Sequence, residues 1–241
     1  MRITVKSMKP MISVIIPAFN EEAYIAGVLE SLTEQTFKDF EVIVVDKEST
    51  DRTRDIAAKY GKVIIEKREG IGLARNTGVQ AAKGKIIFFT NADTKLAKNA
   101  LGVHAKAFKN KKLVAASGPL VPLEETTAFI RFGYRFASVW LAKLSFALGQ
   151  PAIAGSNFAV RKDAFRKVGG FDTALETYED LDLTLRLRKT GEIAYLNDAV
   201  VATSTRRIRK WGVLRYIYFN ASNVIKYNFF KKSHGNYEYV R

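Results

Sequence analysis

The chain has 241 residues, of which 47% are hydrophobic and 26% charged, which is enough apolar material for a folded core and excludes a disordered chain. It contains no cysteine and two histidines. Disulfides, thiolate metal sites and a cysteine nucleophile are therefore excluded, and metal binding or acid–base chemistry falls to carboxylates. The net charge of +15 would attract phosphates, nucleic acid or anionic lipid headgroups.

No stretch of the sequence has the roughly 18 uninterrupted apolar residues that a membrane-spanning helix needs. The nearest candidate, residues 129–150, is interrupted by Arg131, Arg135 and Lys143. The basic N-terminal residues are followed by Lys9 rather than by the apolar centre of a signal peptide. We therefore expect a cytoplasmic chain.

Apolar runs of strand length alternate with segments of helical periodicity through the first half of the chain. This alternation predicts an α/β fold with a mostly parallel, doubly wound central sheet. The predicted strands are residues 12–17, 40–46, 62–66 and 85–90. The predicted helices between them are residues 21–34, 51–59 and 73–82.

The second half has a mixed pattern. It predicts a helix over 97–108, a strand over 113–117, a long aromatic helix from Phe129, a strand over 152–160 and a helix that begins near Asp180. The chain has no internal repeat or linker-like segment. We therefore expect one domain over residues 1–203 and a basic, aromatic C-terminal appendage over residues 204–241.

Polar residues follow three of the predicted strands. Because open parallel sheets bind ligands at the carboxyl ends of their strands, these residues are candidates for a binding site. Asp46 and Asp51 have a second interpretation, since an Asp before a helix also accepts hydrogen bonds from its free backbone N–H groups. The three segments are Pro17-Ala18-Phe19-Asn20-Glu21-Glu22, Asp46-Lys47-Glu48-Ser49-Thr50-Asp51 and Asn91-Ala92-Asp93.

The order of these segments resembles that of the family 2 glycosyltransferases, whose fold is called GT-A. In this family a P-x-x-N-E segment, an Asp-rich turn, a G-x-x-x-A-R-N segment, a D-x-D motif, an acceptor-side loop and an E-D catalytic motif follow one another. The resemblance covers about residues 11–211. The matching residues are Pro17, Asn20 and Glu21; Asp46; Gly70 to Asn76 with Arg75; Asn91 to Asp93; Gly155, Ser156 and Asn157; and Glu179 with Asp180.

The resemblance implies a nucleotide-diphosphate sugar donor, UDP- or GDP-linked, and a divalent cation, Mg²⁺ or Mn²⁺. Asn91 stands where the family has the first Asp of D-x-D, which leaves Asp93 as the metal carboxylate and the diphosphate as the source of further ligands. Arg75 follows two glycines at a predicted helix start, where a guanidinium and backbone N–H groups can meet phosphate. The implied donor-binding residues are Pro17, Ala18, Asn20, Glu21, Asp46, Arg75, Asn91, Ala92 and Asp93.

Asp180 is the candidate catalytic base. Displacing a nucleoside diphosphate with inversion requires a base for the acceptor hydroxyl. The predicted position of Asp180 at a helix N-terminus favours its ionised form through the helix dipole. Helix capping or a charge pair with Arg186 or Arg188 is the alternative interpretation. With an anionic phosphate as acceptor, Asp180 would orient the acceptor instead.

Two segments carry both aromatic residues and cations. From Phe129, apolar residues recur at helical spacing, and this face is suited either to burial against the sheet or to a membrane interface. In the appendage, residues 207–211 resemble the family's Q-x-x-R-W element, which lies near the diphosphate. The candidates for binding a phosphate or the acceptor are Gly155, Ser156, Asn157, Glu179, Arg206, Arg207, Lys210 and Trp211.

The sequence thus predicts an inverting, metal-dependent glycosyltransferase that works peripherally at the cytosolic face of a membrane on a polyprenyl-phosphate or lipid-linked saccharide. The same chemistry on a soluble saccharide or small molecule is the alternative. The charge would also suit a nucleic-acid-binding protein. We expect no nucleic acid partner, because carboxylates at the strand ends would repel a phosphate backbone and the sequence has no aromatic RNA-binding motif.

Overall fold

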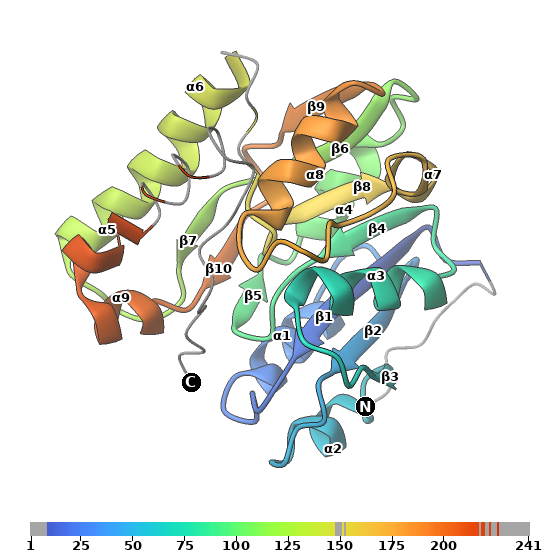
Figure 1. The fold of residues 1–241 in the computed structure, drawn as a ribbon, viewed down its shortest axis with the longest axis horizontal. Coiled ribbons are helices and arrows are strands. Elements are labelled where there is room, and N and C mark those ends of the chain that lie inside the picture. Colours follow the sequence, from blue (N-terminus) through green and yellow to red (C-terminus); the bar gives the residue numbers. More distant parts are fainter. Residues whose placement is uncertain are drawn as a thin grey trace.

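A seven-stranded sheet forms the centre of the molecule (Figure 1), in the order β3-β2-β1-β4-β8-β6-β9. The computed structural model describes residues 9–147, 151, 153–216, 218, 219, 222 and 226. Neighbouring strands run parallel except β8, which is antiparallel to β4 and β6. The predicted α/β class with a mostly parallel sheet is confirmed. The strands are β1 (Ile12–Ala18), β2 (Phe40–Asp46), β3 (Lys62–Ile65), β4 (Ile86–Phe89), β6 (Leu113–Ser117), β8 (Phe158–Arg161) and β9 (Glu192–Tyr195).

Helices cover both faces of this sheet, which is why β1 and β2 read as almost continuous apolar runs. Ile16 of β1 packs in the core on one face, whereas Ile15 packs in the core on the other. The first core takes residues from α1 (Ile25–Thr33), α2 (Thr53–Ala57) and α4 (Ala100–Ala107). The second takes residues from α3 (Ile71–Ala81), α7 (Lys162–Lys167) and α8 (Glu179–Arg188).

A second sheet has three short strands, β5 (Thr94–Leu96), β10 (Val201–Thr203) and β7 (Leu120–Pro122), in the order β5-β10-β7. The sequence analysis did not predict it, because three residues are too few to show a strand period. Its pairing places Thr203 opposite Thr94. The backbone N–H of Ser204 then donates to the carbonyl of Asp93 at 3.0 Å, so α9 (Arg206–Trp211) begins beside the loop that follows β4.

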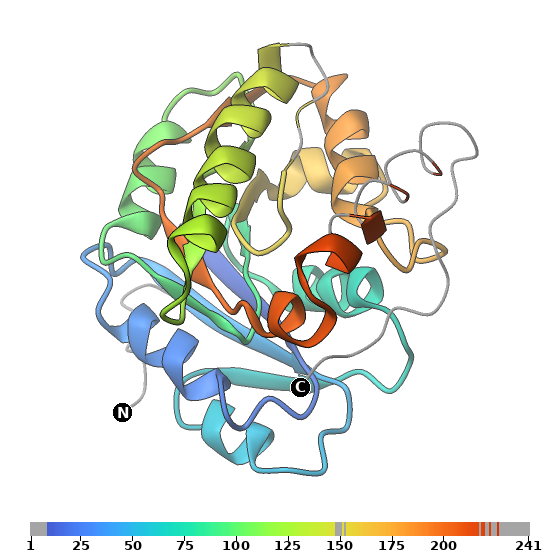
Figure 2. The same cartoon turned by 90° about the vertical axis from the view of Figure 1, so that its left-hand side faces the viewer.

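The aromatic segment forms one continuous helical stretch (Figure 2), made of α5 (Ala128–Arg135), the π-helix η1 (Phe136–Leu141) and α6 (Ala142–Ala147). Its apolar face does not pack against the sheet, so the burial interpretation is wrong for these side chains. No helix in the described part of the chain is long and apolar enough to cross a membrane. The exposed fractions are 71% for Phe129, 69% for Phe132, 46% for Phe136, 65% for Trp140 and 53% for Leu144.

Hydrogen bonds anchor this aromatic helix through its opposite side. The Ser138 hydroxyl donates to the carbonyl of Leu120 at 2.9 Å, and the Tyr195 hydroxyl donates to the carbonyl of Ser138. The predicted strand over 152–160 is confined to its last part, in β8. Residues 227–241 of the predicted appendage lie outside the described residues, and the division of the chain at residue 204 stays a prediction.

Gly78 tests the packing of α3 on the sheet. A Cβ at this position would lie 2.5 Å from Cγ2 of Ile15 and 3.2 Å from Cγ2 of Val45. We expect Gly78→Ala to lower the free energy of unfolding by about 1–3 kcal/mol, because both neighbours belong to the packed sheet. Urea denaturation measures this change. Gly133→Ala is the control, since Gly133 lies in α5 with no atom within 4 Å of its Cβ position and alanine favours a helix. Equal stability of the Gly78 variant and the wild type would contradict this packing.

Candidate active site

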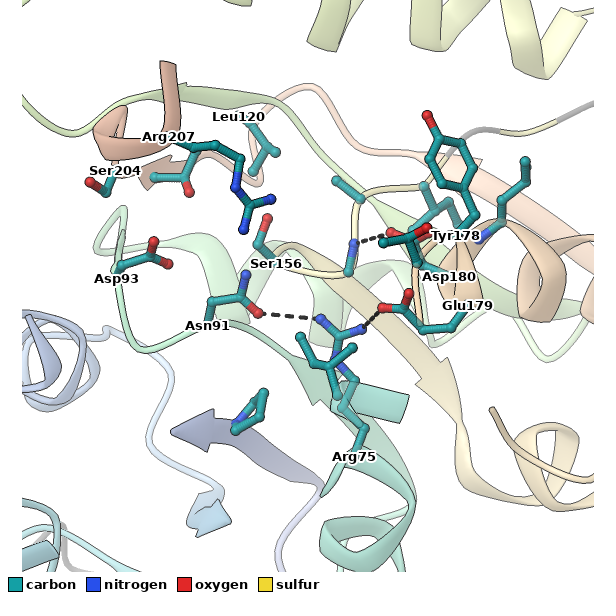
Figure 3. A pocket seen from close by; sticks show the side chains of 18 of the residues that line it. Arg75, Asn91, Asp93, Leu120, Ser156, Tyr178, Glu179, Asp180, Ser204 and Arg207 are labelled. Carbon is teal, nitrogen blue, oxygen red and sulfur yellow. Dashed lines mark hydrogen bonds and ion pairs between the residues drawn. The ribbon is translucent and has the colours of Figure 1, made fainter. Parts of the chain in front are cut away.

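A cavity of about 1770 Å³ opens where β1 and β4 end. Figure 3 shows Asp93 on one side of it and Asp180 on the other, with Asn91 and Ser156 between them. Most of the predicted site residues line this cavity, although they come from segments far apart in the sequence. They are Pro17, Ala18, Glu21, Arg75, Asn91, Ala92, Asp93, Gly155, Ser156, Glu179, Asp180, Arg206 and Arg207.

Five predicted site residues are not among the described residues that line the cavity: Asn20, Asp46, Asn157, Lys210 and Trp211. Asp46 is fully buried and accepts hydrogen bonds from the backbone N–H and the hydroxyl of Ser49, at 2.9 and 2.5 Å. Asn20 accepts from the backbone N–H of Thr50 at 2.8 Å. These two side chains shape the turns at the strand ends, and Asp46 therefore closes a turn rather than capping a helix.

Asn157 is also a structural residue in this arrangement, although the sequence analysis placed it on the acceptor side. Its side chain is fully buried and donates to the carbonyls of Ala199 and Pro119, at 2.8 and 3.2 Å. Asp51 fits the interpretation as a helix-capping residue. Its carboxylate accepts from the backbone N–H of Thr53 at 2.9 Å, at the start of α2.

Arg75 ties three parts of the cavity together. Its guanidinium is almost fully buried and donates to Glu179 at 2.7 Å and to the side-chain oxygen of Asn91 at 3.2 Å. It also lies 5.3 Å from the ring centroid of Phe171. A Cβ at Gly155 would come within 2.6 Å of this guanidinium, which explains the glycine there. Arg75 thus positions the cavity wall through Glu179 and Asn91, and its contact with a phosphate stays a prediction.

Asp180 occupies the second position of α8, as the sequence predicted. Its two carboxylate oxygens accept from the backbone N–H groups of Gly155 at 2.9 Å and of Leu181 at 2.8 Å. Burial raises the pKa of Asp180, although the charge of Arg75 and these hydrogen bonds oppose the rise. The alternative interpretation, a charge pair with Arg186, does not hold, because Arg186 donates to Asp182 at 2.8 Å. A carboxylate with a raised pKa that still faces the cavity is suited to accept a proton.

Glu179 lies beside Asp180 and is buried. Burial and the neighbouring charge of Asp180 raise the pKa of Glu179 to about 7, against the opposing effect of Arg75. The two neighbouring carboxylates therefore titrate together as a pair.

A second arginine cluster lies at the other end of the cavity. Arg206 donates to both carboxylate oxygens of Glu21, at 2.8 and 2.6 Å, and its Nη2 lies 3.1 Å from Oδ2 of Asp93. All three side chains are mostly buried, with 16%, 13% and 15% of their surface exposed for Arg206, Glu21 and Asp93. Burial raises the pKa of Asp93, and the charges of Arg206 and Arg207 oppose the rise.

The side chains around Asp93 do not form a ligand set that fits a resident divalent cation. Within residues 9–147 and the other described positions, no group of three or more His, Asp or Glu side chains is placed to hold a metal ion. The carboxylate of Asp93 is paired with Arg206, and the oxygen of Asn91 accepts from Arg75. Hard cations such as Mg²⁺ and Mn²⁺ require several free oxygens.

The sequence analysis missed two acidic residues, one that lines the cavity and one that holds α9 beside it. Glu66 lines the cavity and accepts from Arg68 and Thr77, and the hydrogen bonds of Arg68 lower the pKa of Glu66 to about 2. It ends the predicted strand 62–66, so the search of strand ends could have found it. Glu124 accepts from the Ser204 hydroxyl at 2.5 Å and from the backbone N–H of Thr205 at 2.7 Å, and fixes the start of α9. No sequence pattern links positions so far apart.

The family model described as Glycosyl transferase family 2 matches residues 13–169, more than half of the chain. The chain belongs to this family. Among its relatives, an uncharacterized glycosyltransferase of Haemophilus influenzae is 30% identical over 197 residues, which cover 73% of this chain and 62% of the relative. An uncharacterized glycosyltransferase of Rickettsia typhi is 26% identical, over 80% of this chain and 63% of the relative. The family 2 chain therefore spans somewhat less than two thirds of the length of these relatives.

Solved structures show the same fold. A mannosyltransferase from Pyrobaculum calidifontis, in complex with GDP-Man and Mn²⁺, aligns with a TM-score of 0.64 at 20% identity, over 85% of this chain and 60% of that protein. TarS of S. aureus, in complex with UDP-GlcNAc, aligns with a TM-score of 0.62 at 24% identity, over 81% of this chain and 58% of that protein. The predicted GT-A fold is confirmed for this family 2 chain.

The raised pKa of Glu179 predicts a pH-dependent stability. An unfolded glutamate titrates near pH 4.5, whereas Glu179 titrates at about 7 in the folded chain. Between these values only the folded state holds the proton, so the contribution of Glu179 to the free energy of unfolding falls as the pH rises. We expect the stability of the wild type relative to Glu179→Gln, measured in urea, to be greater at pH 5 than at pH 7.5. The same difference at both pH values would contradict the raised pKa.

Proposed function

We propose that this chain transfers a sugar from a nucleotide-diphosphate sugar to an acceptor, with inversion at the anomeric carbon. The observation that carries the proposal is one cavity with a buried carboxylate, Asp180, at one end and the cations Arg206 and Arg207 at the other. The neighbours solved with GDP-Man and with UDP-GlcNAc support this donor class.

The reaction assigns a role to each end of the cavity. The oxygen of the acceptor hydroxyl attacks the anomeric carbon, and its proton passes to the carboxylate of Asp180. The bond from the anomeric carbon to the diphosphate oxygen breaks, and its electron pair stays on that oxygen. The guanidinium groups of Arg206 and Arg207 stabilise the negative charge that develops there. Inversion follows if the acceptor and the leaving diphosphate lie on opposite sides of the sugar.

The exposed aromatic face supports a lipid-linked acceptor at a membrane surface. Phe129 and Phe136 belong to this face and also line the cavity, so the face continues to the cavity mouth. Arg131, Arg135 and Lys143 are exposed on the same helical stretch. Aromatic side chains flanked by cations suit the interface of an anionic membrane. A soluble acceptor would require no such face.

The prediction of a divalent cation has support from a neighbour, since the Pyrobaculum mannosyltransferase was solved with Mn²⁺. The ligands around Asp93 in this chain do not fit such an ion while Arg206 is paired with them. The proposed reaction therefore includes no step at a metal.

Asp180→Asn tests the base. The variant keeps the shape of the side chain but cannot take the proton, so turnover with a hydroxyl acceptor should fall by about 10²-fold or more. The assay is release of nucleoside diphosphate from a panel of UDP- and GDP-sugars. Affinity for the donor should change little. Asp182→Asn is the matched control, because Asp182 lies in the same helix and pairs with Arg186. An Asp180 variant that keeps most of the wild-type rate would rule out this role.

The exposed aromatic face predicts binding to anionic liposomes. The double variant Phe132→Ser, Trp140→Ser should lose at least about tenfold in liposome affinity, because each exposed aromatic ring contributes apolar burial at the interface. Sedimentation with phosphatidylglycerol vesicles measures the affinity. Ile65→Ser is the control, since Ile65 is 50% exposed on the edge strand β3. If the wild type does not sediment with the vesicles, a soluble acceptor is favoured.

A further inference from the structure

The position that the resemblance assigns to a metal ion holds a guanidinium in this chain. Asp93 would be the metal carboxylate, and Nη2 of Arg206 lies 3.1 Å from its Oδ2. The same guanidinium donates to both oxygens of Glu21, at 2.8 and 2.6 Å. One permanent cation thus sits between the loop after β1 and the loop after β4, where the cavity opens.

Position 91, at the start of the same motif, is also less suited to a metal ion than the residue that the family has there. Asn91 provides an amide where the family has a carboxylate, and its oxygen already accepts from Arg75 at 3.2 Å. A neutral amide is a weaker ligand for Mg²⁺ or Mn²⁺ than a carboxylate. The loss of one acid and the gain of a paired arginine both reduce the attraction of this position for a divalent cation.

The arginine is built into the fold rather than lying loosely on the surface. It starts α9, whose preceding residues are held by the β5–β10 pairing and by the hydrogen bonds of Ser204 and Thr205 to Glu124. The ring of Tyr24 lies 4.8 Å below its guanidinium. Its side chain is 16% exposed, so it still reaches the cavity.

We propose that Arg206 replaces the divalent cation, so that this chain binds the diphosphate of its donor without a metal. The inference rests on the proposed nucleotide-sugar donor. A guanidinium has five N–H donors, and the three contacts with Glu21 and Asp93 leave others for a phosphate. Arg207 lies next to it, lines the same cavity and in Figure 3 points toward Asn91 and Ser156. The two arginines provide the positive charge that a metal ion otherwise brings to the leaving diphosphate.

Calorimetry of UDP and GDP binding tests this proposal, with the protein first stripped with EDTA. We expect the wild type to bind one of the two nucleotides in EDTA with an affinity within about threefold of that in Mn²⁺. Arg206→Ala should lose about tenfold or more in EDTA, since charge-assisted hydrogen bonds to phosphate are lost. Mn²⁺ should then restore its binding, because Glu21 and Asp93 are released to act as metal ligands.

Three further variants make the test specific. Arg206→Lys keeps the charge and should retain part of the binding in EDTA, and it replaces the alanine variant if that variant does not fold. Arg209→Ala is the matched control, because Arg209 lies in the same helix, is 55% exposed and contacts Glu124. Its binding should be unchanged. Asn91→Asp in the presence of Arg206 should not create a requirement for Mn²⁺.

The possible failures are distinguishable. If the wild type binds a nucleotide only with Mn²⁺, or if Arg206→Ala binds as the wild type does in EDTA, the metal replacement is wrong and the proposed donor stands. If the wild type binds neither nucleotide in EDTA or in Mn²⁺, the proposed donor is wrong and the replacement falls with it.

Discussion

The ion pair between Arg75 and Glu179 is the interaction on which the cavity depends. Both side chains are buried, and the Arg75 guanidinium also contacts Asn91 after β4 and lies against Gly155 in the loop before β8. A buried charge left without its partner costs about 3–5 kcal/mol, so the three segments are held in one arrangement. Asp180 follows Glu179 directly and accepts from Gly155, and the position of the proposed base therefore depends on the same pair.

Both ends of the cavity place buried carboxylates beside arginines. At the Asp180 end, burial is the largest effect and raises the pKa values of Glu179 and Asp180, and Arg75 opposes the rise. At the Asp93 end, burial also raises the pKa of Asp93, and Arg206 and Arg207 oppose the rise. The proposed reaction uses the two ends differently. It uses the carboxylate of Asp180 as the proton acceptor and the positive charge of Arg206 and Arg207 for the diphosphate.

The sequence predicted six of the seven strands of the central sheet, all but β9, and most of the residues around the cavity. Strands buried on both faces carry continuous apolar runs, and the predicted strands over 40–46 and 113–117 have the bounds of β2 and β6. It was insufficient to predict the strands and contacts that depend on pairing between segments far apart in the sequence. Three-residue strands are too short to show the alternation of apolar and polar residues that indicates a strand. Arg206 pairs with Glu21, which lies 185 positions away in the sequence. For the same reason the sequence could not predict the protein partner of Arg75, which is Glu179.

The small sheet explains how the chain places Arg206 beside Asp93. β10 pairs with β5 directly after Asp93, so the chain that leaves β10 passes the loop of the D-x-D motif at hydrogen-bonding distance. Arg206, three residues beyond β10, then lies beside Asp93. Glu124, from the loop after β7, holds the same segment from its other side. The fixed cation of Arg206 thus pairs with the carboxylate of Asp93, while Asn91 in the same loop accepts from Arg75 and adds no second carboxylate.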